Sequence, residues 1–126
     1  MADITTVKGL RVLFDPAGIT ALANSDETAQ PGAVIFGIGP EPLTVSQSVN
    51  ALLQGLKLSS SFARLTRLDG SPVWVNCKSI SMARLPASGE YPAEVRSVIF
   101  AGALTQAVRE SLDDARQLIN LAGGNL

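Results

Sequence analysis

The chain has 126 residues and carries 10 Lys and Arg against 11 Asp and Glu, which gives a formal net charge of −1 at pH 7. This balance excludes a strongly basic protein and offers no electrostatic footprint for nucleic acid or anionic lipid. The hydrophobic fraction of 46% excludes a disordered chain, and it leaves apolar surface for partners because few charges remain to cover the outside.

An internal repeat is the main feature of the sequence. Residues 4–19 align without a gap with residues 65–80, at an offset of 61 positions (65 − 4). A repeat of this length predicts one small folding unit that has been duplicated. Further matches follow at offsets of 64 (98 − 34) and 63 (108 − 45), and they join residues 34–36 to 98–100 and residues 45–49 to 108–112.

The repeat divides the chain into two halves. We expect a first β-rich repeat over residues 1–57 and a second over residues 62–126, with a short linker at residues 58–61. A unit of about 60 residues buries only roughly 60% of its unfolded surface and is marginal by itself. The two copies are therefore expected to pack together rather than to stand apart.

In the first half, short apolar runs between turn residues predict five strands and one helix. Lys8 and Gly9 form the expected turn between the first two strands, and Ser48 is the expected N-cap of a short helix. A polar loop is expected at residues 24–32. The strands are expected at residues 4–7, 10–14, 19–23, 33–38 and 43–46.

The second half repeats this order with clearer signals. Asp69 and Gly70 stand between two alternating runs, a pattern typical of a β-hairpin. Ser111 is the expected N-cap of the last helix, with Asp114 three residues later. A loop rich in Pro and Gly is expected at residues 85–94. The strands are expected at residues 62–68, 72–76, 79–84, 95–101 and 104–109.

These elements predict a β-rich α+β fold. Each copy is expected to contain about five antiparallel strands followed by one helix, which lays its apolar stripe on a sheet. The chain has no apolar run of about 18 residues and no basic, apolar leader at its start, so we expect neither a membrane span nor a secretion signal. Synthesis in the cytoplasm is the expectation that follows.

The residues offer little chemistry for catalysis. The chain has no histidine, which removes the commonest general base and metal ligand, and its one cysteine, Cys77, is expected to be a buried thiol. The acidic pairs Asp26-Glu27 and Asp113-Asp114 are expected in a solvated loop and in the first turn of a helix. We therefore predict no catalytic, metal or cofactor site and no small-molecule substrate.

Two aromatic residues and three arginines are the candidate contacts with a partner. Trp74 and Tyr91 are the large amphipathic aromatics, and such residues dominate many protein interfaces. Trp74 aligns with Leu13, which favours core packing of the indole, with a partner contact as the alternative. Basic residues are more frequent in the second half, where they could form a mildly basic stripe. The predicted contact residues are Trp74, Tyr91, Arg64, Arg67 and Arg84.

The second half resembles the FlbD-type (SwrD-type) family of small flagellar-operon proteins. The residues that carry this resemblance are Leu65-Thr66-Arg67-Leu68-Asp69-Gly70, Asn76, Ile80, Ile99 and Val108-Arg109-Glu110-Ser111. The resemblance implies a role in support of motility. The strands and the Val-x-x-Ser helix start are also similar to LytTR-type DNA-binding domains, which implies a regulatory role.

Composition and duplication favour a different function. Few charges, a repeated unit and no catalytic residues predict a non-enzymatic structural protein that binds copies of itself or a larger scaffold. A phage-type decoration or capsid-cementing component fits this profile, and such a protein would be found in the virion. The alternative is a regulatory module, either linked to flagellar motility or LytTR-like and DNA-binding.

Overall fold

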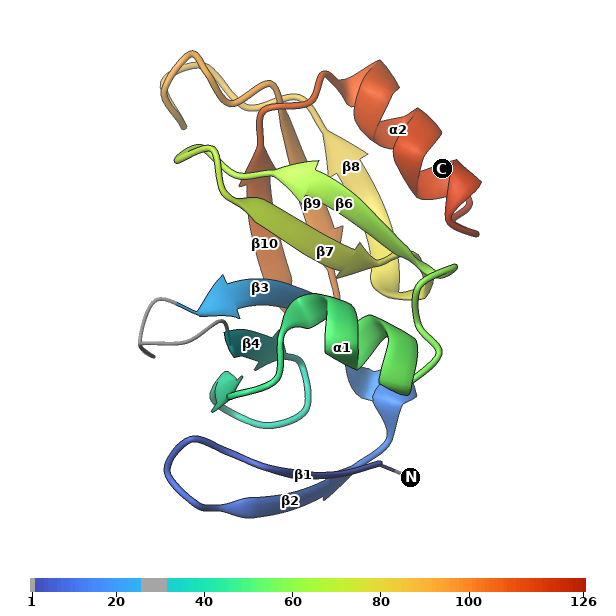
Figure 1. The fold of residues 1–126 in the computed structure, drawn as a ribbon. Coiled ribbons are helices and arrows are strands. Elements are labelled where there is room, and N and C mark those ends of the chain that lie inside the picture. The colour runs from blue at the N-terminus through green and yellow to red at the C-terminus, as the bar shows by residue number, and fades with distance from the viewer. Residues whose placement is uncertain (1, 26–31) are drawn as a thin grey trace.

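The computed structural model describes residues 2–25 and 32–126, which form antiparallel sheets and two α-helices (Figure 1). The prediction of a β-rich α+β fold is confirmed. The strands, in chain order, are β1 (Ala2–Thr5), β2 (Arg11–Phe14), β3 (Ala21–Ser25), β4 (Gly32–Phe36), β5 (Leu43–Val45), β6 (Phe62–Thr66), β7 (Pro72–Asn76), β8 (Ile80–Arg84), β9 (Ser97–Ala101) and β10 (Leu104–Val108); the helices are α1 (Val49–Gly55) and α2 (Leu112–Leu121).

The elements of the two halves follow one another in the same order. Each half has an antiparallel strand pair, a short 3-10 turn, three consecutive antiparallel strands and a helix. The side chain of Asp15 caps the first 3-10 turn and that of Asn76 caps the second, while Ser48 and Ser111 accept from the backbone at the starts of α1 and α2. The two predicted serine caps are therefore confirmed.

The halves do not form separate sheets. The five-stranded sheet has the order β5-β4-β3-β7-β6, so that the strand pair of the second half extends the three strands of the first. The other two sheets are the pair β1-β2 and the run β10-β9-β8. We call the β3–β7 contact the internal joint; its paired residues are Ala21 with Val75, Leu22 with Trp74, and Ala23 with Val73.

Asn76 stabilises the internal joint through hydrogen bonds of its backbone and its side chain. Its backbone N donates to the Thr20 carbonyl at 2.9 Å, and its Nδ2 donates to the Ile19 carbonyl at 2.8 Å. Its Oδ1 accepts from the Lys78 backbone N at 3.0 Å. Asn76 is only 4% exposed, so each bond satisfies a polar group that water does not reach.

Two hydrophobic cores lie on opposite faces of the shared sheet. The first collects side chains of the first half and also takes Phe62 and the partly buried Trp74 from the second. The second collects side chains of the second half and takes Ala21 from β3. Because neighbouring residues of a strand point to opposite faces, β3 and β7 supply both cores at once.

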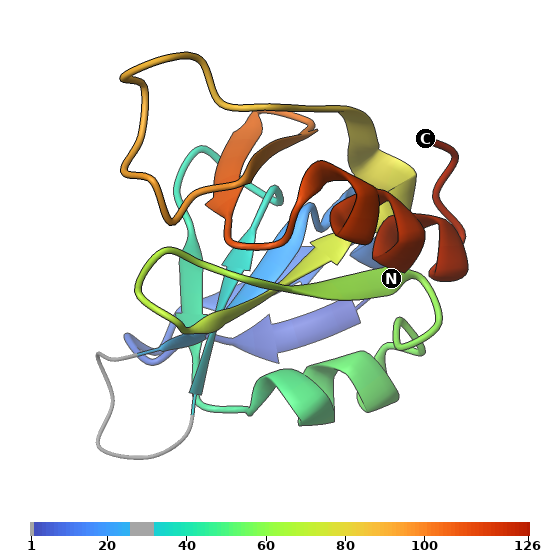
Figure 2. The same cartoon turned by 90° about the horizontal axis from the view of Figure 1, so that it is seen from above.

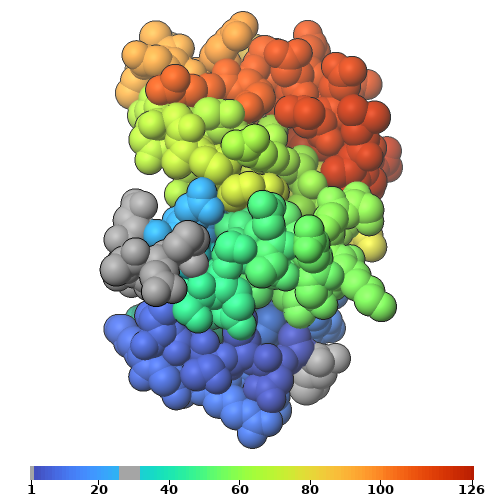
Figure 3. All heavy atoms as spheres, viewed as in Figure 1, coloured from blue at the N-terminus to red at the C-terminus, as the bar shows by residue number. Residues whose placement is uncertain are grey.

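The molecule is a stack of these parts (Figures 1 and 3). In Figure 1 the pair β1-β2 lies at the bottom, the shared sheet with α1 in the middle, and β8 and α2 at the top. Seen from above in Figure 2, the elements of the second half lie nearest the viewer. Among the described residues, no helix is long and apolar enough to cross a membrane.

Some predicted boundaries are wrong by two residues or so. The first strand ends at Thr5 because Thr6 already accepts the turn bond from Gly9. The ninth strand begins at Ser97 rather than at residue 95, because the Val95 backbone N turns back to the Pro92 carbonyl. Of the predicted polar loop at 24–32, the first two residues belong to β3, and residues 26–31, which include Asp26 and Glu27, lie outside the described residues.

Replacing Asn76 by Ala should destabilise the protein strongly. The change leaves the buried Ile19 carbonyl without its donor, a loss that typically costs about 1–3 kcal/mol. The matched control is Asn120→Ala, since the side chain of exposed Asn120 bonds only the backbone of Leu126 within the described contacts. Urea unfolding should show a clearly lower midpoint for Asn76→Ala than for the control, and equal midpoints would contradict the role given to Asn76.

Candidate partner-contact surface

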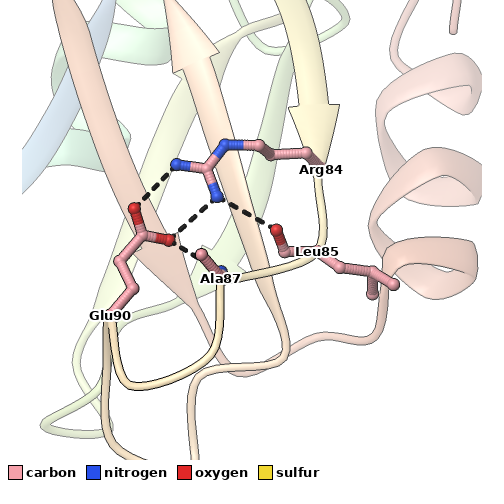
Figure 4. Close-up of polar contacts among 4 residues, drawn as sticks. All are labelled: Arg84, Leu85, Ala87 and Glu90. Carbon is pink, nitrogen blue, oxygen red and sulfur yellow. Dashed lines mark hydrogen bonds and ion pairs between the residues drawn. The ribbon is translucent and has the colours of Figure 1, made fainter.

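Arg84 lies at the end of β8 and holds the loop that follows this strand (Figure 4). Its Nη1 and Nη2 donate to the two carboxylate oxygens of Glu90, each at 2.8 Å. Nη1 also donates to the Leu85 carbonyl at 3.0 Å, and the guanidinium lies 5.3 Å from the centre of the Phe100 ring. A planar guanidinium suits this combination of a bidentate pair and a stacked ring.

Glu90 is the acidic side of this arrangement. The hydrogen bond from Arg84, and after it the bond from the Ala87 backbone N, lower the pKa of Glu90 to about 2. The carboxylate therefore stays ionised at any ordinary pH. Arg84 is consequently a neutralised and positioned side chain rather than a free positive charge.

Arg64 and Trp74 lie opposite each other on β6 and β7. The Arg64 guanidinium stands 5.8 Å from the centre of the Trp74 ring, within the range of a cation–π contact. Trp74 packs partly buried against the first core, in register with Leu22 of β3. The indole thus belongs to the internal joint, and Arg64 covers its open side.

Arg67 lies just beyond β6 and contacts the first half. Its guanidinium stands 6.0 Å from the centre of the Phe36 ring of β4. Its Nε is buried and has no hydrogen-bond partner among the described residues. Tyr91, the fifth predicted contact, lies half-buried in the loop after β8, next to Glu90 in the sequence.

The five predicted residues therefore do not form one common contact in the structure. Arg64, Arg67 and Arg84 each lie over a different aromatic ring, and Arg84 also has an acidic partner. A basic stripe needs guanidinium groups free to face a ligand. These three instead cover apolar rings of their own chain.

Four of the residues that carry the resemblance to the FlbD-type family, Thr66, Leu68, Arg109 and Glu110, are joined by hydrogen bonds. The Thr66 backbone N and Oγ1 each donate to the carboxylate of Glu110 at 2.8 Å. The Arg109 backbone N donates to the Thr66 carbonyl at 2.8 Å, and Arg109 Nε donates to the Leu68 carbonyl at 2.9 Å. This cluster ties β6 to the start of α2, a contact that the sequence analysis did not assign to Glu110.

The exposed apolar side chains of β2 and β8 are not among the predicted contact residues. Leu13 on β2 is 58% exposed and Met82 on β8 is 46% exposed. Leu85, which follows β8, is 62% exposed. The alignment of Leu13 with Trp74 could have indicated this exposure. Trp74 contacts the other half of the chain, and Leu13 is an apolar residue at the matching position.

A shallow hollow of about 380 Å³ adjoins the exposed side of β8. It is lined by residues of β8, by the first turns of α2 and by the chain end. Most of its lining is apolar, and it holds one charged side chain. Its lining residues are Ser81, Met82, Ala83, Leu112, Arg116 and Leu126.

The described residues contain no group of three His, Cys, Asp or Glu side chains placed to hold a metal ion. Cys77 is buried, as predicted, and the burial raises the pKa of its thiol. A buried thiol with a raised pKa is a poor nucleophile.

Comparison of the chain with protein-family models, with curated proteins and with solved structures found no match.

Replacing Glu90 by Gln should remove a pH-dependent part of the stability. Because the pKa of Glu90 is lowered to about 2, its ion pair stabilises the folded state above the ordinary pKa of 4.5, and this contribution is lost as the pH falls toward 2. We expect the variant to melt below the wild type at pH 7, and the difference to disappear near pH 2.

The matched control is Glu94→Gln, which changes an exposed carboxylate of the same loop. Its melting temperature should follow that of the wild type throughout the titration. A Glu90→Gln curve parallel to the wild type at every pH would contradict the ion pair with Arg84.

Proposed function

We propose that this chain is a non-enzymatic assembly protein, which binds copies of itself or a larger scaffold in the manner of a phage-type decoration or capsid-cementing component. The observation that carries the proposal is the exposure of Leu13 and Met82 on two strands that each have one outer edge without a paired strand in the described residues. Open strand edges with apolar side chains are templates for pairing with another chain.

The pairing of the two halves supports a duplicated unit as the basis of the assembly. Ile4 pairs with Val12 in the first half, and Leu65 pairs with Val73 in the second, each at the offset of 61 found in the sequence. One isolated bridge joins Thr6 to Val45, and another joins Arg67 to Val108. The two bridges match, since Arg67 follows Thr6 by 61 positions (67 − 6) and Val108 follows Val45 by 63 (108 − 45). We infer that the halves are copies of one unit that already assembles within the chain.

The residues around two surface hollows agree with the non-enzymatic role that we propose. The chain has no histidine. The hollow beside β8 and α2 contains no carboxylate side chain, and the hollow between the β1–β2 turn and β5 has Glu41 as its one acidic residue. Neither hollow therefore contains the pair of carboxylates that general acid–base catalysis would use.

A regulatory role, linked to motility or to DNA, is the second candidate, and it rests on the cluster of Thr66, Arg109 and Glu110. This cluster forms a compact contact between β6 and α2. Because its hydrogen bonds join residues of the same chain, a structural role is enough to explain why Thr66, Arg109 and Glu110 occur there. The assembly proposal is therefore the better supported one.

The native mass, measured by light scattering after size exclusion at low and moderate salt, tests the proposal. We expect a discrete multiple of the chain mass, which changes little with salt because the exposed side chains are apolar. A monomer at all concentrations, together with salt-dependent binding to duplex DNA, would overturn the assembly proposal in favour of the regulatory one.

A further inference from the structure

The strands of the molecule form one continuous series, which has two ends. The bridge between Thr6 and Val45 joins the pair β1-β2 to the edge of the five-stranded sheet at β5. The bridge between Arg67 and Val108 joins the other edge, at β6, to β10. The series is thus β2-β1, β5-β4-β3-β7-β6, β10-β9-β8, and its outer strands are β2 and β8.

These outer strands correspond to the two strands of the internal joint. By the sequence offset of 61, β2 occupies in the first half the place that β7 occupies in the second, and β8 occupies the place of β3. The strand pairing agrees at residue level: Ala21 lies opposite Phe36, and Met82 lies opposite the matching residue Phe100. The outer strands β2 and β8 are therefore the equivalents of β7 and β3, which pair in the internal joint. β2 and β8 do not pair with each other.

Side chains of the outer strands β2 and β8 are more exposed than the matching side chains of the internal joint, as expected if the outer strands lack a partner strand. In the internal joint, Leu22 is fully buried and Trp74 is partly buried against it. At the outer strands, Leu13, which matches Trp74, is 58% exposed, and Met82, which matches the fully buried Ala21, is 46% exposed.

The hollow beside β8 matches a filled space in the first half. Its lining residues Ala83, Leu112 and Arg116 correspond to Leu22, Val49 and Leu53 at offsets of 61 (83 − 22) and 63 (112 − 49; 116 − 53). The latter three belong to the first core, which Phe62 and Trp74 complete from the other half. A strand laid along β8 would bring its residue equivalent to Trp74, which is Leu13, to this hollow.

One molecule cannot satisfy both edges by itself in this structure. The pair β1-β2 and the strand β8 lie at opposite ends of the stack, with the shared sheet between them (Figure 1). Among the described strands, the complementary edge for each is therefore offered by another copy. A contact between two different surfaces of identical chains is heterologous, and it repeats to give a closed ring or a filament.

We propose that β8 of one molecule pairs antiparallel with β2 of a second copy, in the register of the internal joint. Met82 then lies opposite Phe14 of the second copy, Ala83 opposite its Leu13, and Arg84 opposite its Val12. This inference rests on the proposed assembly function and names its partner and its geometry.

Disulfide trapping tests the register. Facing residues of neighbouring antiparallel strands have Cα atoms about 4.5–5.5 Å apart, within the range that a disulfide spans. Leu13→Cys and Ala83→Cys variants are purified separately, mixed in equal amounts and oxidised gently. Native Cys77 is kept because it is buried. We expect a covalent dimer in the mixture, little in either variant alone, and a ladder of multimers from the double variant.

The register control combines Leu13→Cys with Met82→Cys, since neighbouring residues of a strand point to opposite faces. This mixture should give no more dimer than the single variants. Leu13→Cys that cross-links with itself would indicate a symmetric contact between equal edges, and it would overturn the head-to-tail joint.

The native mass separates failure of this joint from failure of the assembly function. An oligomer by light scattering that fails to cross-link at Leu13 and Ala83 would overturn the joint and leave the assembly proposal standing. A monomer by light scattering with no cross-linking would overturn the joint, and salt-dependent binding of that monomer to duplex DNA would overturn the assembly proposal as well.

Leu13→Lys provides a second test without cysteine chemistry. A charge at this position would have to be buried against β8, so we expect association to weaken about tenfold or more, which corresponds to about 1.4 kcal/mol. Leu10→Lys is the matched control, because Leu10 is 60% exposed but lies in the turn before β2 and outside the proposed joint. Equal association of the two variants, both folded by circular dichroism, would overturn the joint.

Asp15→Asn should strengthen the association. Asp15 matches Asn76, whose Nδ2 donates across the internal joint to the Ile19 carbonyl. A carboxylate has no proton to donate, so the joint between copies lacks this bond until an amide restores it. Because Asn can also cap the 3-10 turn, as Asn76 does, the fold should be retained. Concentration-dependent light scattering should show tighter association, and unchanged or weaker association would overturn the equivalence of the two joints.

Discussion

The pairing of β3 with β7 is the contact on which the rest of the structure depends. It covers three residue pairs, yet it merges two short strand systems into one five-stranded sheet and supplies both hydrophobic cores. Buried Asn76 adds two bonds to the first half, and these are directional where the apolar contacts are not. A small core alone gives little stability, so sharing one sheet between two cores is an effective arrangement for a chain of this size.

The same pairing determines what the molecule exposes. When the second half supplies its strand pair to the first, the strand pair of the first half and the three strands of the second remain at opposite ends. Unpaired edges are a liability for a monomeric protein, which commonly protects them with charges or with a bulge. β2 and β8 carry the exposed apolar side chains of Leu13 and Met82 beside one charged residue each, Arg11 and Arg84. β8 also has an irregularity between Ile80 and Met82.

The arginines show how the tertiary structure changes the meaning of a sequence feature. In the sequence, Arg64, Arg67 and Arg84 are an excess of positive charge in the second half. In the structure they lie over Trp74, Phe36 and Phe100. Long guanidinium side chains protect apolar rings from water while their charge stays near solvent. A charge count could not reveal this, because these contacts join residues that are distant in sequence or opposite across a strand pair.

The sequence by itself determined the elements and their order. Turn glycines, the capping serines Ser48 and Ser111, and the change from alternating to helical spacing act over a few residues, so they can be read locally. Only the tertiary structure decided that β7 pairs with β3, that Trp74 is covered while the matching Leu13 is exposed, and that Glu110 holds β6. These outcomes depend on which strand edges meet, and the two halves present their strands in the same order, so signals that act over a few residues do not decide the pairing.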